Sequence, residues 1–454
     1  MSDIAMRPAH VLSEAIRRRD VSSRELLEHY LDRVERLNPP LNAVVTLDPD
    51  GGRQAADAAD AALARGDVDG PLHGVPMTIK DTFETAGMRT TCGLAAWDCV
   101  PDRDAAAVRL LRDAGAVIFG KTNTPTMAGD WQTFNAVFGT SNNPWDTTRT
   151  TGGSSGGSAA ALAAGMTALE LGSDIAGSIR VPSNWCGVCG HKSSWGIVPQ
   201  RGHLPPKPGS LAGTDLAVMG PMARDVEDLE LALGILARPE GHQAVGWRLE
   251  LPAPRAETLS ELRFAVWFDD PAYPLEDEIR NALESAVAAM RQAGARIVDA
   301  QPPVALTEMV GLHLELILPI LGGNAATLLH REWLSANERR EQLRARMADF
   351  FRDVDALLMP VAVVPAIPHD HSEPFAGRKI QSSGGSRPYM DMFGWVALAT
   401  VAYLPATVVP VGRTPTGLPV GIQIVGPYLE DRTTLAVARH IEHLLGGFVA
   451  PPGV

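Results

Sequence analysis

The sequence predicts an α/β protein with a buried, mostly parallel or mixed β-sheet. Short apolar segments with the length of strands alternate along the chain with amphipathic segments at helical spacing. The 43 glycines and 35 prolines of the 454 residues favour many sharp turns. No fixed-period repeat is present, which argues against a solenoid.

The first strong element is a helix. Ser22-x-x-Glu25 is a capping box, and apolar residues follow at helical spacing as far as Leu37. Asn38-Pro39-Pro40 is expected to end this helix, because proline cannot donate a backbone hydrogen bond. An Ala-rich second helix is expected at 53–65.

Strands and helices alternate through the rest of the chain. The segment 238–258, rich in proline, glycine and charge, is expected to be a linker or surface crossover. The expected strands are 74–79, 116–119, 263–268, 295–298, 354–364, 406–411 and 419–425, and the expected helices are 105–114, 276–293 and 431–445.

Composition excludes several function classes. The formal net charge of −13 repels phosphate backbones, so nucleic acid is not an expected partner. Met1–Asp20 lacks the apolar core of a secretory signal. The apolar stretch Met309–Leu321 contains His313 and Glu315 and is too short to span a bilayer. We therefore expect a cytoplasmic protein without a membrane partner. The sequence does not indicate an oligomeric state.

Two patterns could suggest metal or redox chemistry. Cys186-x-x-Cys189 has the spacing of a redox pair or of half a zinc site, but the chain has four cysteines and no second such pair. Small buried packing residues are the favoured interpretation. His369-Asp-His371 is a candidate metal pair, for which a solvated loop is the favoured interpretation. No metal and no organic cofactor is expected.

The most informative segment is rich in glycine and serine and runs from Thr150 to Ser158. A flexible linker is disfavoured because apolar segments flank it. A Walker loop fails because Ser158 and Ala159 stand where lysine and serine or threonine are needed. Gly152–Gly156 fits the G-x-S-x-G nucleophile elbow, but no hydrophobic strand precedes it.

This segment resembles the amidase signature family. The resemblance covers nearly the whole chain, in order, and other segments fit the family's lysine segment, connecting region and later landmarks. Its motifs are Gly152-Gly-Ser-Ser-Gly-Gly-Ser-Ala-Ala-Ala161, Gly172-Ser-Asp-Ile-Ala-Gly-Ser-Ile-Arg-Val-Pro182, Gly74-Val-Pro-Met-Thr-Ile-Lys-Asp81, Gly120-Lys-Thr-Asn123, Gly139-Thr-Ser-Asn-Asn-Pro-Trp-Asp146, Gly220-Pro-Met-Ala-Arg-Asp-Val-Glu-Asp-Leu229 and Gly417-Leu-Pro-Val-Gly-Ile-Gln-Ile-Val-Gly-Pro427.

The resemblance implies an amidase signature fold, a central mixed sheet covered by helices on both faces. It implies a single domain over 1–454, with an N-terminal helical segment at 1–65, the catalytic core at 66–240, and the rest of the sheet and the substrate-channel helices at 241–454. The substrate-channel part, from Leu306 to Met347, contains no recognisable motif.

The resemblance also implies the site residues. Ser178 matches the nucleophile, Ser154 the bridging serine that follows a cis peptide, and Lys80 the general base. The backbone N–H groups of Ile175, Ala176, Gly177 and Ser178 match the oxyanion hole. Asp174 and Arg180 are expected to pair and hold the loop. Candidates near the substrate are Asp130, Trp131 and Gln132, for which a role in the core or at the surface is an equal alternative.

Two departures from the family pattern lie near these residues. The family usually has two glycines before the nucleophile, where this chain has Ala176-Gly177. The family commonly has Lys-Pro-Thr where this chain has Lys192-Ser-Ser194. Both changes bear on substrate preference.

Chemistry explains why these residue types are needed. A serine hydroxyl becomes a nucleophile when a base removes its proton. Lysine is that base only when neutral, so its pKa must fall from ~10.4 to about 7 to 8. The expected reaction is hydrolysis of an amide, an anilide, or a carbamate (urethane) or ester, through an acyl-enzyme. The alternatives are a glutamine amidotransferase subunit of a tRNA-dependent complex and a binding protein without activity, against which the intact trio argues.

Overall fold

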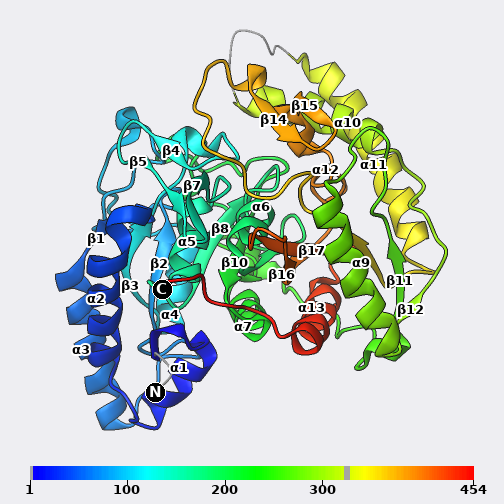
Figure 1. The fold of residues 1–454 in the computed structure, drawn as a ribbon. Coiled ribbons are helices and arrows are strands. Elements are labelled where there is room, and N and C mark those ends of the chain that lie inside the picture. Colours follow the sequence, from blue (N-terminus) through cyan, green and yellow to red (C-terminus); the bar gives the residue numbers. More distant parts are fainter. Residues whose placement is uncertain (1–3, 322–327) are drawn as a thin grey trace.

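The computed structural model describes residues 4–321 and 328–454, and its centre is an eight-stranded sheet (Figure 1). The strand order is β12-β11-β13-β17-β16-β9-β10-β8. Strand β11 runs parallel to β12 and β13, and the other neighbours pair antiparallel. The sheet is therefore mixed, as expected. Its strands are β8 (Glu170–Asp174), β9 (Cys189–Lys192), β10 (Val218–Ala223), β11 (Arg263–Val266), β12 (Arg296–Ile297), β13 (Ala356–Met359), β16 (Ala406–Arg413) and β17 (Pro419–Val425).

Helices cover both faces of this sheet. Successive side chains of a strand point to opposite faces, and neighbouring positions contact different helices. Gln423 of β17 accepts a hydrogen bond of 2.7 Å from Arg180, at the start of α6 (Arg180–Cys186). Thr407 of β16 pairs with Ile424, the residue that follows Gln423, so its side chain points to the other face. There Thr407 donates a hydrogen bond of 2.9 Å to Thr434 of α13 (Asp431–Leu445). Helix α5 (Gly156–Ala163) packs beside α6, and α7 (Val226–Leu236) and α9 (Asp277–Gln292) pack beside α13. The expected fold class is confirmed.

A second, three-stranded sheet was not predicted. Its order is β1 (Val44–Leu47), β3 (Val117–Thr122) and β2 (Pro76–Lys80), and β2 lies beside β8 of the central sheet. The Thr78 hydroxyl of β2 donates a hydrogen bond to the buried Glu170 carboxylate of β8. Helices α1 (Ala9–Arg17), α2 (Ser23–Leu41), α3 (Pro49–Arg65) and α4 (Ala106–Asp113) belong to this side of the molecule (Figure 1). The small sheet brings the C-terminal end of β2 to the central sheet.

Several predicted boundaries were wrong. The capping box at Ser22 is present, but α2 continues to Leu41 because both prolines adopt helical backbone angles, and Asn42 ends it in the left-handed region. Helix α3 begins four residues before 53, since Asp48 caps it and Pro49 takes its first position. The strand expected at 354–364 covers only β13, because Pro360 cannot donate in a central strand.

On the opposite side from α2 and α3 lie the helices of the later chain (Figure 1). Helix α10 (Leu306–Leu321) packs against α11 (His330–Phe350) and α12 (Ala397–Val401). A hairpin, β14 (Lys379–Ser382) and β15 (Gly385–Pro388), lies nearby (Figure 1). The region expected to shape the substrate channel includes 322–327, which lie outside the described residues. Besides short 3-10 helices, the structure also has α8 (Gln243–Gly246), β4 (Phe134–Asn135), β5 (Gly139–Thr140), β6 (Asn142–Asn143) and β7 (Asp146–Thr150).

One large hydrophobic cluster joins these parts, with buried residues from Ala5 to Ile441. The expected crossover at 238–258 lies outside this core over most of its length, with Val245 and Trp247 exposed. Within residues 4–321 and 328–454, no helix combines the length and apolar character needed to cross a membrane.

Candidate active site

Lys80 is the last residue of β2 and is fully buried. Its Nζ donates a hydrogen bond of 2.6 Å to Ser154 Oγ and one of 3.0 Å to Ser173 Oγ of β8. Burial lowers the pKa of Lys80 to about 7, against the weaker opposing influence of nearby acidic groups. The amine therefore has access to its neutral form near neutral pH and can accept a proton.

Ser154 lies in the loop that precedes α5, and it is also buried. The Gly153–Ser154 peptide bond is cis, as the family resemblance implied. Gly153 packs against a neighbouring loop so closely that a Cβ there would lie 2.8 Å from the carbonyl carbon of Trp131. Only glycine fits at this position without displacing backbone. The loop is thereby held against the segment that contains Asp130 and Trp131.

Ser178 lies in the short loop between β8 and α6. The loop folds around the Asp174 carboxylate, which accepts hydrogen bonds from the backbone N–H groups of Gly177 (2.8 Å) and Ile179 (3.1 Å). Gly177 has φ of +93°, which favours glycine strongly. This loop presents Ser178, which is 5% exposed, at a cavity wall.

A buried ion pair anchors the same loop. Arg180 Nη2 lies 2.9 Å from Asp174 Oδ1, and both side chains are fully buried. Arg180 also donates to Gln423, to Thr400 and to the Val396 carbonyl. Burial alone would raise the pKa of Asp174, but the guanidinium outweighs it and holds that pKa well below its usual range. The expected Asp174–Arg180 pair is confirmed.

The four expected oxyanion donors are not equivalent. The Gly177 N–H is already committed to the Asp174 carboxylate, so this part of the expectation needs correction. No acceptor is present among the described residues for the N–H groups of Ile175, Ala176 and Ser178. These three amides are the ones free to bind a developing negative charge.

Two cavities meet at Ser178. The larger, of about 190 Å³, has a mostly apolar lining. The smaller, of about 40 Å³, contains both Ser154 and Ser173. Three residues, Ala128, Ile175 and Ser178, line both. The lining of the larger cavity also includes Trp131, Leu314, Ile317, Leu318, Phe375, Met390 and Phe393.

One step of the expected relay is not formed as a hydrogen bond. Ser154 and Ser178 line the same small cavity, but no hydrogen bond joins their hydroxyls in the part of the chain that the structure describes. Catalytic hydrogen bonds are often long or misaligned in substrate-free sites and tighten on binding. The arrangement thus brings the three residues to one place and connects two of them directly.

The three substrate candidates have different positions. Asp130 and Trp131 line the larger cavity. Asp130 is not a free charge, since it forms an ion pair with Arg378 and accepts a hydrogen bond of 2.8 Å from the Tyr389 hydroxyl. Gln132 is absent from both cavity linings, and its amide exchanges hydrogen bonds of 2.7 and 2.9 Å with the backbone of Asp370. Its structural role is to hold the segment around Asp370.

The two departures from the family pattern have separate consequences. Ala176 is one of the residues that line the larger cavity. Ser193 donates a hydrogen bond of 2.9 Å to the Met219 carbonyl, and Ser194 donates one of 2.6 Å to the Asp431 carboxylate of α13. Neither serine lines a cavity beside Ser178.

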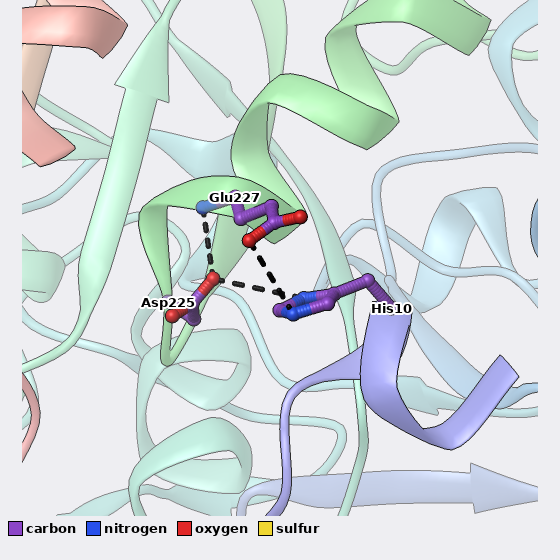
Figure 2. Close-up of side chains that lie close together, drawn as sticks. All are labelled: His10, Asp225 and Glu227. Atoms are coloured by element: carbon purple, nitrogen blue, oxygen red, sulfur yellow. Dashed lines mark hydrogen bonds and ion pairs between the residues drawn. The ribbon is translucent and has the colours of Figure 1, made fainter. Parts of the chain in front are cut away.

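Among the described residues, no three-ligand cluster includes the candidate metal or redox residues. All four cysteines are free, and Cys186 and Cys189 are buried as packing residues. Over the described ranges, the single cluster of three side chains able to share a metal ion is His10, Asp225 and Glu227 (Figure 2). This cluster does not include His369. Its three side chains lie together because His10 of α1 forms ion pairs with Asp225 and Glu227 at the start of α7.

Sequence reasoning missed two polar residues. Ser173 gives Lys80 a second hydroxyl partner, and its place within the signature segment was the available signal. His313 donates 2.9 Å from Nε2 to the Ile175 carbonyl. A lone histidine in the apolar stretch Met309–Leu321 was its only signal.

Comparison with known proteins shows the family. The Amidase family profile matches residues 25–318 and 311–435. The chain is 30% identical to human fatty-acid amide hydrolase 2 over 97% of this chain and 89% of that protein. It is 31% identical to a glutamyl-tRNA(Gln) amidotransferase subunit from Acidothermus cellulolyticus, over 97% of this chain and 95% of that protein. A solved amidase structure superposes with a TM-score of 0.81 at 30% identity, covering 97% of this chain and 100% of that one. The chain belongs to the amidase signature family, and it is a hydrolase of carbon–nitrogen amide bonds.

Proposed function

We propose that the chain is a serine amidase in which Ser178 forms an acyl-enzyme, while Lys80 takes and returns its proton through Ser154. The observation that carries this proposal is the 2.6 Å hydrogen bond between a buried lysine and Ser154, beside the cavity that Ser178 lines. A lysine whose pKa is about 7 can serve as a general base near neutral pH.

Each step uses groups already described. Ser178 Oγ attacks the amide carbonyl, and its proton passes to Ser154, whose own proton passes to Lys80. The oxyanion accepts hydrogen bonds from among the three free N–H groups, those of Ile175, Ala176 and Ser178. When the intermediate collapses, Lys80 returns the proton through Ser154 to the leaving nitrogen. Water then repeats the sequence on the acyl-enzyme and releases the acid.

The two cavities divide the substrate. Ser154, which must give a proton to the leaving nitrogen, lines only the smaller cavity. We therefore assign the leaving group to the smaller cavity and the acyl group to the larger. About 40 Å³ is room for roughly three waters, which suits ammonia or a small amine. The aliphatic and aromatic lining of the larger cavity suits an apolar acyl chain.

A substrate panel tests this assignment with the chain purified alone. Primary amides of apolar acids should be hydrolysed with the highest kcat/KM, ahead of anilides, carbamates and esters with bulky leaving groups. Glutamine should be a poor substrate, because Asp130, the only charged side chain among the described residues that line the larger cavity, is already paired. Efficient hydrolysis of glutamine, or activity only with added protein partners, would instead favour the amidotransferase alternative.

A further inference from the structure

Two ring N–H groups hold consecutive carbonyl groups of the loop before Ser178. Trp131 Nε1 donates 2.7 Å to the Ala176 carbonyl, and His313 Nε2 lies 2.9 Å from the Ile175 carbonyl. A carbonyl oxygen can only accept, so His313 Nε2 carries the proton. Trp131 comes from the loop after β3, and His313 from α10, a wall of the acyl cavity.

The tautomer of His313 is fixed by its surroundings. The side chain is fully buried, and burial lowers its pKa to about 4, so the ring is neutral at working pH. Its Nδ1 has no hydrogen-bond partner among the described residues. The neutral ring therefore donates its only N–H to the Ile175 carbonyl.

Peptide planarity carries the effect from the carbonyl to the amide. The C=O and N–H of a trans peptide unit point in opposite directions in one plane. Fixing the Ile175 carbonyl therefore fixes the Ala176 N–H. The peptide group between Ala176 and Gly177 is held at both ends. Trp131 holds its carbonyl, and the Asp174 carboxylate accepts from its N–H. The unit between Ile175 and Ala176 is held at its carbonyl and leaves its N–H free for the oxyanion.

Both donor rings, those of Trp131 and His313, pack against the ring of Phe393. His313 packs edge-on against Phe393, with ring centroids 5.0 Å apart, and Phe393 packs edge-on against Trp131 at 4.8 Å. Phe393 and Trp131 also line the acyl cavity. The contact with Phe393 restricts the imidazole to the orientation that reaches Ile175.

We propose that His313 is a positioning residue of the oxyanion hole, which aims the Ala176 N–H by holding the Ile175 carbonyl. This inference rests on the proposed function, since it needs an oxyanion formed by attack of Ser178. Removing one oxyanion donor in other hydrolases costs about 10²- to 10³-fold in kcat. Loosening a donor should cost less, about 10- to 100-fold.

The test compares His313→Phe and His313→Asn, which lack a donor at the Nε2 position, with His313→Gln, whose amide can reach it. Each variant is measured for kcat, KM, thermal unfolding and affinity for a trifluoromethyl ketone, which forms a tetrahedral serine adduct. We expect both non-donor variants to lose kcat and inhibitor affinity by a similar factor, with KM within about twofold, and Gln to restore much of both.

A control separates this role from a structural one. Leu314→Ala, the next residue on α10, alters the acyl cavity itself and should raise KM more than it lowers kcat. Folded non-donor variants with unchanged kcat and inhibitor affinity would overturn the inference, as would a kcat loss without loss of inhibitor affinity. If instead Ser178→Ala kept full activity, the proposed function would fail first, which is a distinguishable result.

Discussion

Lys80 Nζ lies 2.6 Å from Ser154 Oγ, and both side chains are buried. Removal from water makes the lysine a base near neutral pH, and the hydrogen bond gives its proton a direct route towards the cavity beside Ser178.

Substitution of Lys80 should abolish catalysis through loss of the base. Lys80→Ala should reduce kcat by about 10²- to 10⁴-fold. Lys80→Arg should be as inactive, because arginine keeps its proton at all accessible pH values. Steady-state kinetics on the best primary amide measures both. An active arginine variant would show that neutral Lys80 is not the base.

The pH profile should rise through about pH 7. The pKa of Lys80 is lowered to about 7, so protonation below that value removes the base and deprotonation above it restores activity. Lys192 is a matched control, since burial also lowers its pKa to about 7 but it donates to backbone carbonyls. The profile of Lys192→Met should keep the same midpoint, whereas a shifted or flat profile in that variant would assign the titration to Lys192.

Breaking the Asp174–Arg180 pair should destabilise the fold. Arg180→Met leaves a buried carboxylate without its counter-ion, which should cost about 3–5 kcal/mol in urea unfolding. Asp174→Asn added to Arg180→Met should recover part of this loss. Arg36→Ala, which breaks an exposed pair with Asp32, should cost less than about 1 kcal/mol. Equal losses at the two arginines would contradict the proposed anchoring of the loop.

Ala176→Gly should widen the acyl preference. Ala176 lines the larger cavity, so removal of its methyl group should raise kcat/KM for branched or aromatic acyl groups by about 10-fold relative to a short linear one. Competition between two such amides in one reaction measures the ratio. An unchanged ratio would place the acyl group elsewhere.

His10 should stabilise the protein in a pH-dependent way. Its ring forms a hydrogen bond with Asp228. The ring also faces Asp225 and Glu227 (Figure 2). These contacts raise the pKa of His10 above the usual value. A raised folded-state pKa gives stability that is fully present below the unfolded value of about 6.5 and is lost as pH rises through the folded value. Solvent screening limits it to about 1 kcal/mol or less.

Thermal unfolding of His10→Ala and the native chain at several pH values tests this. The difference in Tm should be larger at pH 6 than at pH 9. A difference that grows with pH would contradict the assigned charge state of His10.

Local signals in the sequence predicted much of the fold. Helix α13 begins and ends at the predicted residues, because its apolar spacing and Gly446 define both ends. The ends of α2 and β13 were misplaced, since the effect of proline depends on where it falls in a helix or sheet. The small sheet of β1, β2 and β3 was missed, because pairing between distant segments leaves no periodic signal.

The candidate site was predictable where contiguous motifs define it. The signature segment indicated Ser154, Ser178 and the Asp174–Arg180 pair. The use of the Gly177 N–H by Asp174 was not predictable, because it depends on how the loop turns. The contact of His313 with Ile175 joins residues 138 apart in sequence, and only the packing of α10 reveals it.

The most direct test of the account is the site and rate of labelling by a fluorophosphonate, located by mass spectrometry. The folded native chain should be modified at Ser178 alone, faster above pH 7 than below it, and Lys80→Ala should be labelled far more slowly. Modification at another serine, or equal labelling of Ser178 in the native chain and in Lys80→Ala, would contradict the proposed proton relay.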